Sequence, residues 1–208
     1  MGKNKGLLIV LSGPSGVGKG TVRKKLFENP NVNFEYSISM TTRPKRPGEV
    51  EGKDYYFVSY EEFQNRIKEN KFLEHAEFVG NCYGTPLDKV NDKLNEGIDV
   101  FLEIEVKGAH QVREKMKDCI MIFLLPPSKN ELFNRLKKRG TESIDVINER
   151  IKKASREFKY AKDYDYIIVN DDVDLASQKI LSIINAEHLK TSRSIDNYSS
   201  LLDENNEN

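Results

Sequence analysis

The feature that most constrains this chain is a glycine-rich segment that follows a short apolar run near the amino terminus. After the apolar run Leu7–Leu11 and Ser12, the chain continues as Gly13, Pro14, Ser15, Gly16, Val17, Gly18, Lys19, Gly20 and Thr21. A strand, a glycine loop and a helix in this order let backbone N–H groups converge on phosphate oxygens, and the helix N-terminus adds partial positive charge. We therefore predict that residues 13–21 bind the phosphates of ATP, with Lys19 bridging the β- and γ-phosphates. The plainer alternative is a glycine-rich turn with an incidental lysine.

One position departs from the usual form of such a loop. The hydroxyl residue that normally follows the lysine and binds Mg²⁺ is replaced by Gly20, and Thr21 comes one residue later. The order Gly-Lys-Gly-Thr resembles that of nucleoside monophosphate kinases. We therefore expect Mg²⁺ to arrive with ATP and to be held through water and the nucleotide phosphates. Thr21 would contact a phosphate or a metal-bound water, and no direct protein ligand is assigned.

Apolar periodicity predicts the architecture around the loop. Continuous apolar runs indicate four buried parallel strands, at Leu7–Ser12, Val100–Glu105, Ile120–Leu125 and Tyr166–Val169. Helical stripes lie between them, at Leu132, Phe133 and Leu136 and then at Ile144, Ile147, Ile151, Ala154, Phe158 and Ala161. Alternating strands and helices predict an α/β fold with a doubly wound parallel sheet.

Residues 33–90 interrupt this alternation. Short runs of mixed polarity indicate strands at Phe34–Met40, Tyr55–Val58 and Phe72–Val79, with a short helix between the last two and a surface loop at Thr42–Asp54. We predict a single domain over residues 1–190, with a core (1–32, 91–134 and 163–190), a small inserted α+β subdomain (33–90) and a helical lid (135–162). The polar tail 191–208 is expected to be flexible.

The order of motifs within the insert resembles the guanylate kinase family, over about residues 7–185. The matching runs are Ser39–Glu49, Gly52–Phe57, Glu74 and Asn81–Thr85. The resemblance implies transfer of the terminal phosphate of ATP to GMP, giving ADP and GDP, in purine nucleotide metabolism, with the insert binding GMP. Two alternatives stay open at this point: a non-catalytic guanylate-kinase-like interaction module, and a P-loop kinase for another monophosphate.

The resemblance also implies the residues that bind GMP. Arg43 and Arg46 are fork-shaped cations suited to a phosphate dianion, and Tyr55 and Tyr83 would add hydroxyl donors to it. Glu74 is similar in place to the guanine reader of the family, because a carboxylate can accept from both N1–H and the 2-amino group. Ser39 and Thr85 would complete the base site. Glu103 and Glu105 stand where the family usually has Asp, and of the two we favour Glu105 for a role in binding GMP.

Three arginines resemble the lid arginines of the family. Arg135, Arg139 and Arg150 lie in and around the junction of two predicted helices, with Gly140 as a hinge. Together with Lys19 and Arg43 they are the predicted catalytic residues, because phosphoryl transfer needs alignment and charge neutralisation. The phosphate of GMP is already anionic at neutral pH, so no general base is required.

Composition excludes several other classes. Lys plus Arg total 33 and Asp plus Glu total 33, so the basic excess of a nucleic-acid binder is missing. Two distant cysteines, Cys82 and Cys119, and three histidines argue against a zinc site and favour buried free thiols. We see no run of membrane-spanning length and expect a cytoplasmic protein whose partners are ATP and GMP, with no nucleic acid and no membrane. The family resemblance is compatible with a homodimer.

Overall fold

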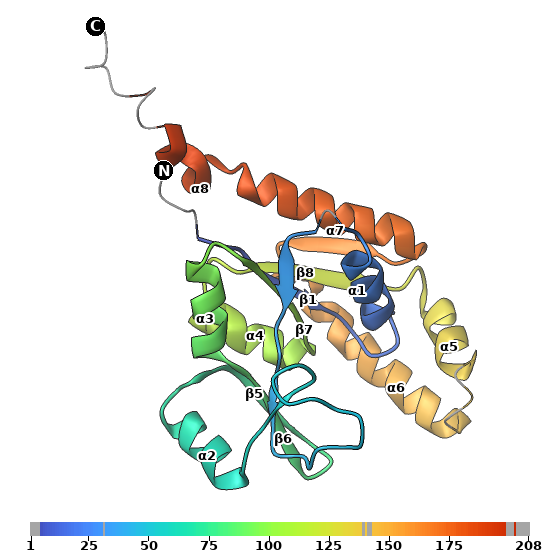
Figure 1. Ribbon diagram of the computed structural model, residues 1–208. Coiled ribbons are helices and arrows are strands. Elements are labelled where there is room, and N and C mark those ends of the chain that lie inside the picture. The colour runs from blue at the N-terminus through green and yellow to red at the C-terminus, as the bar shows by residue number, and fades with distance from the viewer. Residues whose placement is uncertain (1–4, 31, 139, 141–142, 199–201, 203–208) are drawn as a thin grey trace, which may run out of the picture.

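The computed structural model describes residues 5–30, 32–138, 140, 143–198 and 202. Its centre is a five-stranded sheet in the order β2-β7-β1-β8-β9, and every neighbouring pair in it is parallel. The strands are β1 (Leu8–Ser12), β2 (Phe34–Tyr36), β7 (Asp99–Glu103), β8 (Ile120–Leu125) and β9 (Tyr166–Val169). All residues of β1 are buried, because it lies in the middle of the sheet and helices cover both faces (Figure 1).

Each face of this sheet carries its own apolar cluster. Ile9 and Leu11 of β1 face one cluster, and Leu8 and Val10 face the other, as expected from the two-residue period of a strand. The first cluster contains residues of α1 (Lys19–Phe27), α5 (Lys129–Lys138), α6 (Ile144–Glu157) and α7 (Val173–His188). The second contains residues of α3 (Leu87–Asn95) and α4 (Val106–Lys115). Within the described part of the chain, no helix combines the length and apolarity needed to cross a bilayer.

A second, four-stranded sheet lies below the first in Figure 1. Its order is β4-β3-β6-β5, with β3 (Met40–Thr41), β4 (Tyr56–Phe57), β5 (Phe72–Phe78) and β6 (Asn81–Pro86). Helix α2 (Tyr60–Lys68) packs on it, capped by Ser59, whose hydroxyl accepts from the Glu62 N–H at 3.1 Å. A small separate core of Met40, Phe63, Phe72 and Cys82 holds this sheet and helix together.

The structure confirms the four predicted parallel strands of the core, although β9 lies at the edge of the sheet and only its Ile168 is buried. It corrects the strand expected at Phe34–Met40. That segment divides into β2, which pairs with β7 in the core sheet, and β3, which belongs to the second sheet. Packing explains the division: Phe34 stacks on Phe101 of the core at 5.5 Å between ring centroids, whereas Met40 joins the small core of the second sheet. The insert therefore shares its first residues with the core sheet, and the remaining division into core, insert and lid stays a prediction.

Part of the segment after residue 190 has regular structure, while its expected flexibility stays a prediction. Thr191–Ser194 form the short helix α8 and Ile195–Tyr198 form the 3₁₀ turn η2. Arg193 of α8 joins this segment to the core. Its guanidinium donates to the Asp118 carbonyl at 3.1 Å and lies 3.8 Å from the buried Glu187 carboxylate. Another 3₁₀ turn, η1 (Phe158–Asp163), connects α6 to β9.

Candidate active site

The glycine loop lies between the end of β1 and the start of α1, at the carboxyl edge of the parallel sheet. Gly13, Gly16 and Gly18 have φ values of 146°, 92° and 97°, a backbone conformation that residues other than glycine rarely adopt. Space forbids a side chain as well, because a Cβ at Gly13 would lie 2.4 Å from the Leu124 carbonyl oxygen. The glycines are therefore required for this loop to curl back over the strand.

Lys19 begins α1 and folds back onto the loop that precedes it. Its ammonium donates to the carbonyls of Gly13 at 2.6 Å and Pro14 at 3.1 Å. Burial lowers the pKa of Lys19, and the nearby carboxylates of Glu103 and Glu105 act in the opposite direction. The loop thus presents a partly desolvated cation beside its backbone N–H groups, an arrangement suited to an anionic ligand.

Asn170, which follows the edge strand β9, and Arg135 of α5 brace the same loop. The Val17 carbonyl accepts from the Asn170 side-chain amide at 2.8 Å and from Arg135 at 3.3 Å. Arg135 also donates to the Asn170 carbonyl at 2.9 Å, so these two residues brace one another. Asn170 follows β9 directly and is 2% exposed, and a Cβ at Gly18 would lie 2.5 Å from its amide nitrogen. Sequence reasoning missed Asn170, although a polar residue directly after a predicted parallel strand was a usable signal.

Of the other two predicted lid arginines, the structure describes only Arg150. Arg150 on α6 donates to the Ser15 hydroxyl at 2.5 Å, which brings α6 to the glycine loop. Arg139 lies outside the described residues, and Gly140 is exposed with a φ of 66°.

Arg43, in the loop that follows β3, belongs to a polar and aromatic cluster beside the second sheet. Its guanidinium makes a bidentate ion pair with Glu49, at 2.6 and 3.1 Å. The guanidinium carbon lies 5.3 Å from the centroid of the Tyr55 ring, and the Tyr55 and Tyr83 rings are 6.2 Å apart. Arg43 holds the pKa of Glu49 below its usual value. The Arg46 side chain is exposed, while its backbone N–H donates to Glu49 at 2.8 Å.

Glu74 and Thr85 form a buried pair across β5 and β6. The Thr85 hydroxyl donates to Glu74 Oε1 at 2.7 Å, and Glu74 is 8% exposed. Burial raises the pKa of Glu74, an effect that the hydrogen bond from Thr85 partly offsets. The other carboxylate oxygen faces α4, since a Cβ at Gly108 would lie 2.9 Å from Glu74 Oε2. Ser39 lies between β2 and β3, and its carbonyl accepts from the Tyr56 N–H at 2.9 Å.

The two acidic residues after β7 have different surroundings. Glu103 pairs with Arg23 of α1 at 2.8 Å, and its Oε1 lies 3.6 Å from the position of a Cβ at Gly20. Glu105 has a side chain 69% exposed and approaches Lys153 of α6 at 3.4 Å. Glu103 is thus the acidic group against the glycine loop, while the expectation for Glu105 stays untested. Among the described residues, no group of three or more His, Cys, Asp or Glu side chains is arranged to hold a metal ion.

Comparison with known proteins agrees with this geometry. The guanylate kinase family profile matches residues 5–187. The chain belongs to the guanylate kinase family. The guanylate kinase of Lactococcus lactis subsp. lactis is 56% identical over 202 residues, covering 97% of this chain and 98% of that protein. That of Listeria innocua is 57% identical over 199 residues, covering 96% and 97%.

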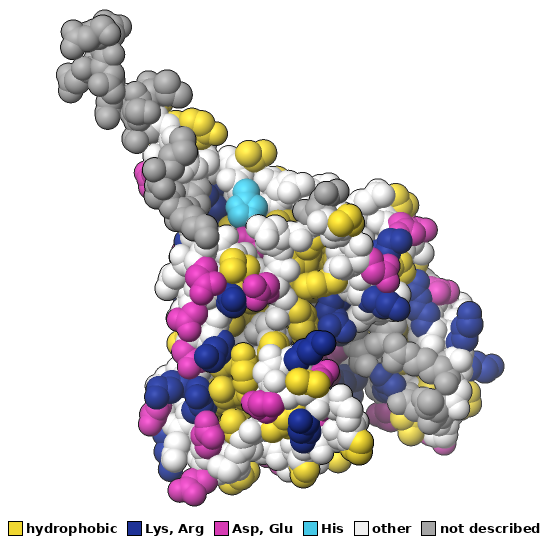
Figure 2. Space-filling model, viewed as in Figure 1, with side chains coloured by type: hydrophobic (Ala, Val, Ile, Leu, Met, Phe, Trp, Pro, Cys, Tyr) yellow, Lys and Arg dark blue, Asp and Glu magenta, His cyan; other side chains and the backbone are white. Residues whose placement is uncertain are grey.

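A solved structure extends the agreement to the fold. The crystal structure of guanylate kinase from Anaplasma phagocytophilum superimposes with a TM-score of 0.71 at 40% identity, covering 93% of this chain and 92% of that one. The resemblance inferred from the motifs and the predicted α/β class are therefore confirmed. The roles of individual site residues stay predictions. In Figure 2, basic side chains border the region where the core, the second sheet and the α5–α6 side of the molecule meet.

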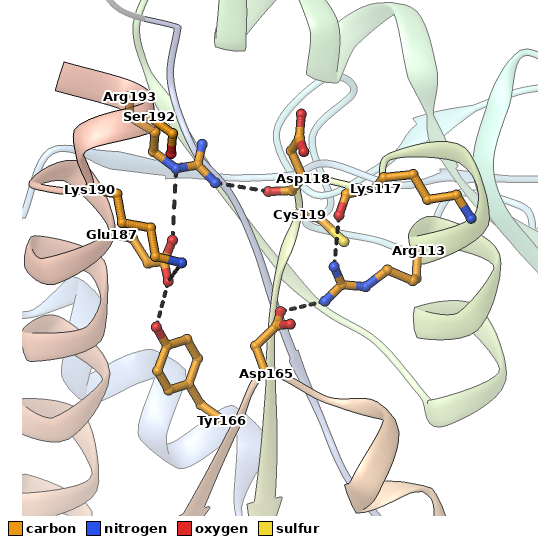
Figure 3. A pocket seen from close by; sticks show the side chains of 10 residues that line it. All are labelled: Arg113, Lys117, Asp118, Cys119, Asp165, Tyr166, Glu187, Lys190, Ser192 and Arg193. Atoms are coloured by element: carbon orange, nitrogen blue, oxygen red, sulfur yellow. Dashed lines mark hydrogen bonds and ion pairs between the residues drawn. The ribbon is translucent and has the colours of Figure 1, made fainter. Parts of the chain in front are cut away.

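A large cavity lies away from these residues. It has a volume of about 690 Å³ and is lined by residues of α4, α7 and α8 and by the starts of β8 and β9. Its charged groups are largely paired with one another, as Figure 3 shows: Arg113 with Asp165, and Lys190 and Arg193 with Glu187. Because these groups already satisfy each other, the cavity is explained as the ion-paired junction that holds α8 to the core.

Proposed function

We propose that this chain is an active guanylate kinase, which transfers the terminal phosphate of ATP to GMP and releases ADP and GDP. The observation that carries the proposal is the combination of a buried carboxylate, Glu74 with Thr85, and the lysine-bearing glycine loop in one molecule. Membership of the family and near-complete coverage of curated guanylate kinases support it.

The base is selected by hydrogen bonding at Glu74. Guanine offers N1–H and the 2-amino group as donors to the carboxylate, whereas adenine offers neither at those positions. Leaving a buried carboxylate without partners reduces binding of the wrong base by orders of magnitude. Thr85 keeps one carboxylate oxygen oriented and Gly108 leaves room for the other.

The phosphate of GMP is assigned to the Arg43 cluster. Arg43 supplies a planar pair of donors, and Tyr55 and Tyr83 bring hydroxyl-bearing rings to the same place. An incoming dianion competes with Glu49 for the guanidinium, which Glu49 holds in position at 2.6 Å. Arg46, exposed in the loop between β3 and β4, would add a second guanidinium.

Transfer itself is a matter of alignment and charge. An oxygen of the GMP phosphate forms a bond to the γ-phosphorus of ATP, and the bond from that phosphorus to the β–γ bridging oxygen breaks to release ADP. Four cations are assigned to neutralise the negative charge on the transferred phosphoryl group: Lys19, Arg135, Arg139 and Arg150. Bound with ATP, Mg²⁺ would neutralise part of the phosphate charge. Glu103 and Thr21 fit contact with its water shell, because Glu103 lies beside Gly20 at the start of α1.

The proposal also includes closure and a compartment. Donor and acceptor residues come from the core and the second sheet, yet in-line transfer requires the two phosphates to meet in a site shielded from water. We therefore expect the insert and the lid to close over both nucleotides.

Cys82 and Cys119 are both free and buried, which suits the reducing cytoplasm.

The test measures ADP formation with ATP and each of GMP, AMP, CMP and UMP. The expected result is turnover with GMP that exceeds turnover with the other three by orders of magnitude. Turnover with another monophosphate instead would reassign the acceptor, and a folded protein with no nucleotide-dependent turnover would favour a binding module.

A further inference from the structure

The strand that carries Glu74 is irregular where the carboxylate sits. Phe72 pairs with Pro86 and Glu74 pairs with Thr85, so Leu73 is an extra residue on β5 and the register shifts there. Bulges of this kind turn a side chain away from its regular direction and are frequent next to active sites. Leu73 is fully buried in the apolar cluster of the core with α4, whereas Phe72 belongs to the core of the second sheet. The bulge therefore fastens β5 to the core sheet at Glu74.

Gln111 of α4 fastens the next residue along the strand. Its side-chain oxygen accepts from the His75 N–H at 3.1 Å, and its amide nitrogen donates to the His75 carbonyl at 3.1 Å. Among the residues that the structure describes, β5 is the edge strand of the second sheet, and no strand there pairs with these backbone groups on that side. One side chain thus replaces the missing strand at the residue directly after Glu74.

Two further residues on the same face of α4 surround Glu74. Gly108, Gln111 and Lys115 are spaced by three and four positions, which places them in one row along the helix. The Lys115 ammonium donates to the Phe72 carbonyl at 2.5 Å, on the other side of Glu74 from Gln111. Gly108 lies against the carboxylate itself. This row of α4 contacts the strand before, at and after Glu74.

We infer that Gln111 is a positioning residue for base selection, which holds the Glu74 carboxylate in its guanine-reading direction through the backbone of His75. The inference rests on the proposed function. It assigns to α4, a helix of the core, a part in reading the acceptor base, while the cations for the acceptor phosphate come from the loop between β3 and β4. Through Gln111, the strand of the base reader contacts the body that carries the glycine loop.

A merely structural role makes a different prediction. If Gln111 only satisfied an edge strand, its loss would lower stability and would affect catalysis equally whether or not Glu74 were a carboxylate. If it acts through Glu74, its effect on GMP use disappears once Glu74 can no longer accept both guanine donors. Coupling between the two positions therefore separates the roles.

The experiment is a double-mutant cycle with Gln111→Met, which keeps the length of the side chain and removes both hydrogen bonds. Steady-state kinetics are measured for wild type, Gln111→Met, Glu74→Gln and the double variant. We expect Gln111→Met to lower kcat/KM for GMP about tenfold in the wild-type background and less than about twofold beside Glu74→Gln. The KM for ATP should stay within about twofold of wild type in all four proteins.

Controls and a second variant keep the outcome decisive. Gln64→Met, on α2 of the second sheet, should leave GMP kinetics unchanged, and thermal unfolding reports the fold of each protein. If Gln111→Met does not fold, the same cycle with Lys115→Met should show about a threefold loss that again vanishes beside Glu74→Gln. Equal losses in both backgrounds would overturn the inference while wild-type turnover of GMP upholds the proposed function. A wild-type protein inactive with GMP would overturn both.

Discussion

The donor and acceptor sides of this molecule are built in opposite ways. The donor loop is one contiguous segment, residues 13–21, in which Lys19 is held by carbonyls of the loop itself. The acceptor side draws Arg43 from one loop, Glu74 and Thr85 from two strands, and Gly108 from a helix of the core. A local loop depends on its glycines and one lysine, whereas an assembled site depends on every element that brings its parts together.

The two sides also hold their cations differently. Lys19 is bound to neutral carbonyl groups, whereas Arg43 is bound to the Glu49 carboxylate. A phosphate therefore meets little competition at Lys19 and a charged competitor at Arg43. We expect the donor side to give one very large mutational effect and the acceptor side several smaller ones that are specific to GMP.

The largest effect is expected for Lys19→Met. Removing the ammonium leaves the transferring phosphate without its loop cation, so kcat should fall on the order of 10³-fold. Coupled ADP formation measures the loss, and thermal unfolding verifies the fold. Lys25→Met, on the exposed side of the same helix beside Asp174, is the matched control and should retain activity. Near-normal turnover of a folded Lys19→Met protein would remove the glycine loop from the mechanism.

The next effect belongs to the acceptor side. In Glu74→Gln the amide nitrogen faces one of the guanine donors. Transition-state binding should therefore weaken by about 2–4 kcal/mol, measured as a loss of kcat/KM for GMP. The KM for ATP should not change, which is what distinguishes this side from the donor loop. Glu77→Gln, on the exposed end of the same strand, is the control. An efficiency toward GMP within a few-fold of wild type would mean that Glu74 does not read the base.

The same contrast explains how much the sequence could predict. The glycine loop and the strand before it are local, so their residues alone indicated both strand and phosphate site. The acceptor residues were predicted only through the order of motifs, and their roles stay predictions. The Arg43–Glu49 pair and the approach of Gly108 to Glu74 have no sequence signature, since the fold alone brings them together.

The strand errors have local causes. β2 and β3 were merged because Ser37–Ser39, where the chain passes from one sheet to the other, contains neither glycine nor proline. β6 was missed because it contains Asn81, Gly84 and Pro86, which are unfavourable in strands, and it is stabilised by its long pairing with β5. Asn170 was missed because its partner, the Val17 carbonyl, is 153 residues away in the chain.

A smaller effect should follow from Gly108→Ala. Alanine favours the helix by up to about 1 kcal/mol relative to glycine, but the new Cβ would lie 2.9 Å from Glu74 Oε2. Because Glu74 is buried, the carboxylate has to turn, and we expect kcat/KM for GMP to fall about fivefold. The KM for ATP and thermal stability should not decrease. Unchanged GMP kinetics would show that Glu74 accommodates the methyl group without leaving its guanine-reading position.

The smallest effect is a dependence on pH that should be confined to the acceptor side. Burial raises the pKa of Glu74 above its ordinary value of 4.5, so the carboxylate gains a proton at a higher pH than an exposed glutamate does. The protonated group cannot accept from both guanine donors, and kcat/KM for GMP should fall about threefold more than that of Glu74→Gln as pH decreases from neutral toward 5.

Stability should change in the opposite sense. The folded state binds this proton more tightly than the unfolded state, so Glu74 destabilises the fold progressively as pH rises from 4.5 through its raised pKa. Denaturant unfolding of wild type and Glu74→Gln, measured from pH 4.5 upward, gives the contribution of Glu74 to the free energy of unfolding. The variant serves as the reference because it lacks the titrating group. Parallel pH profiles for the two proteins, in both kinetics and unfolding, would show that the Glu74 carboxylate is not the group that titrates.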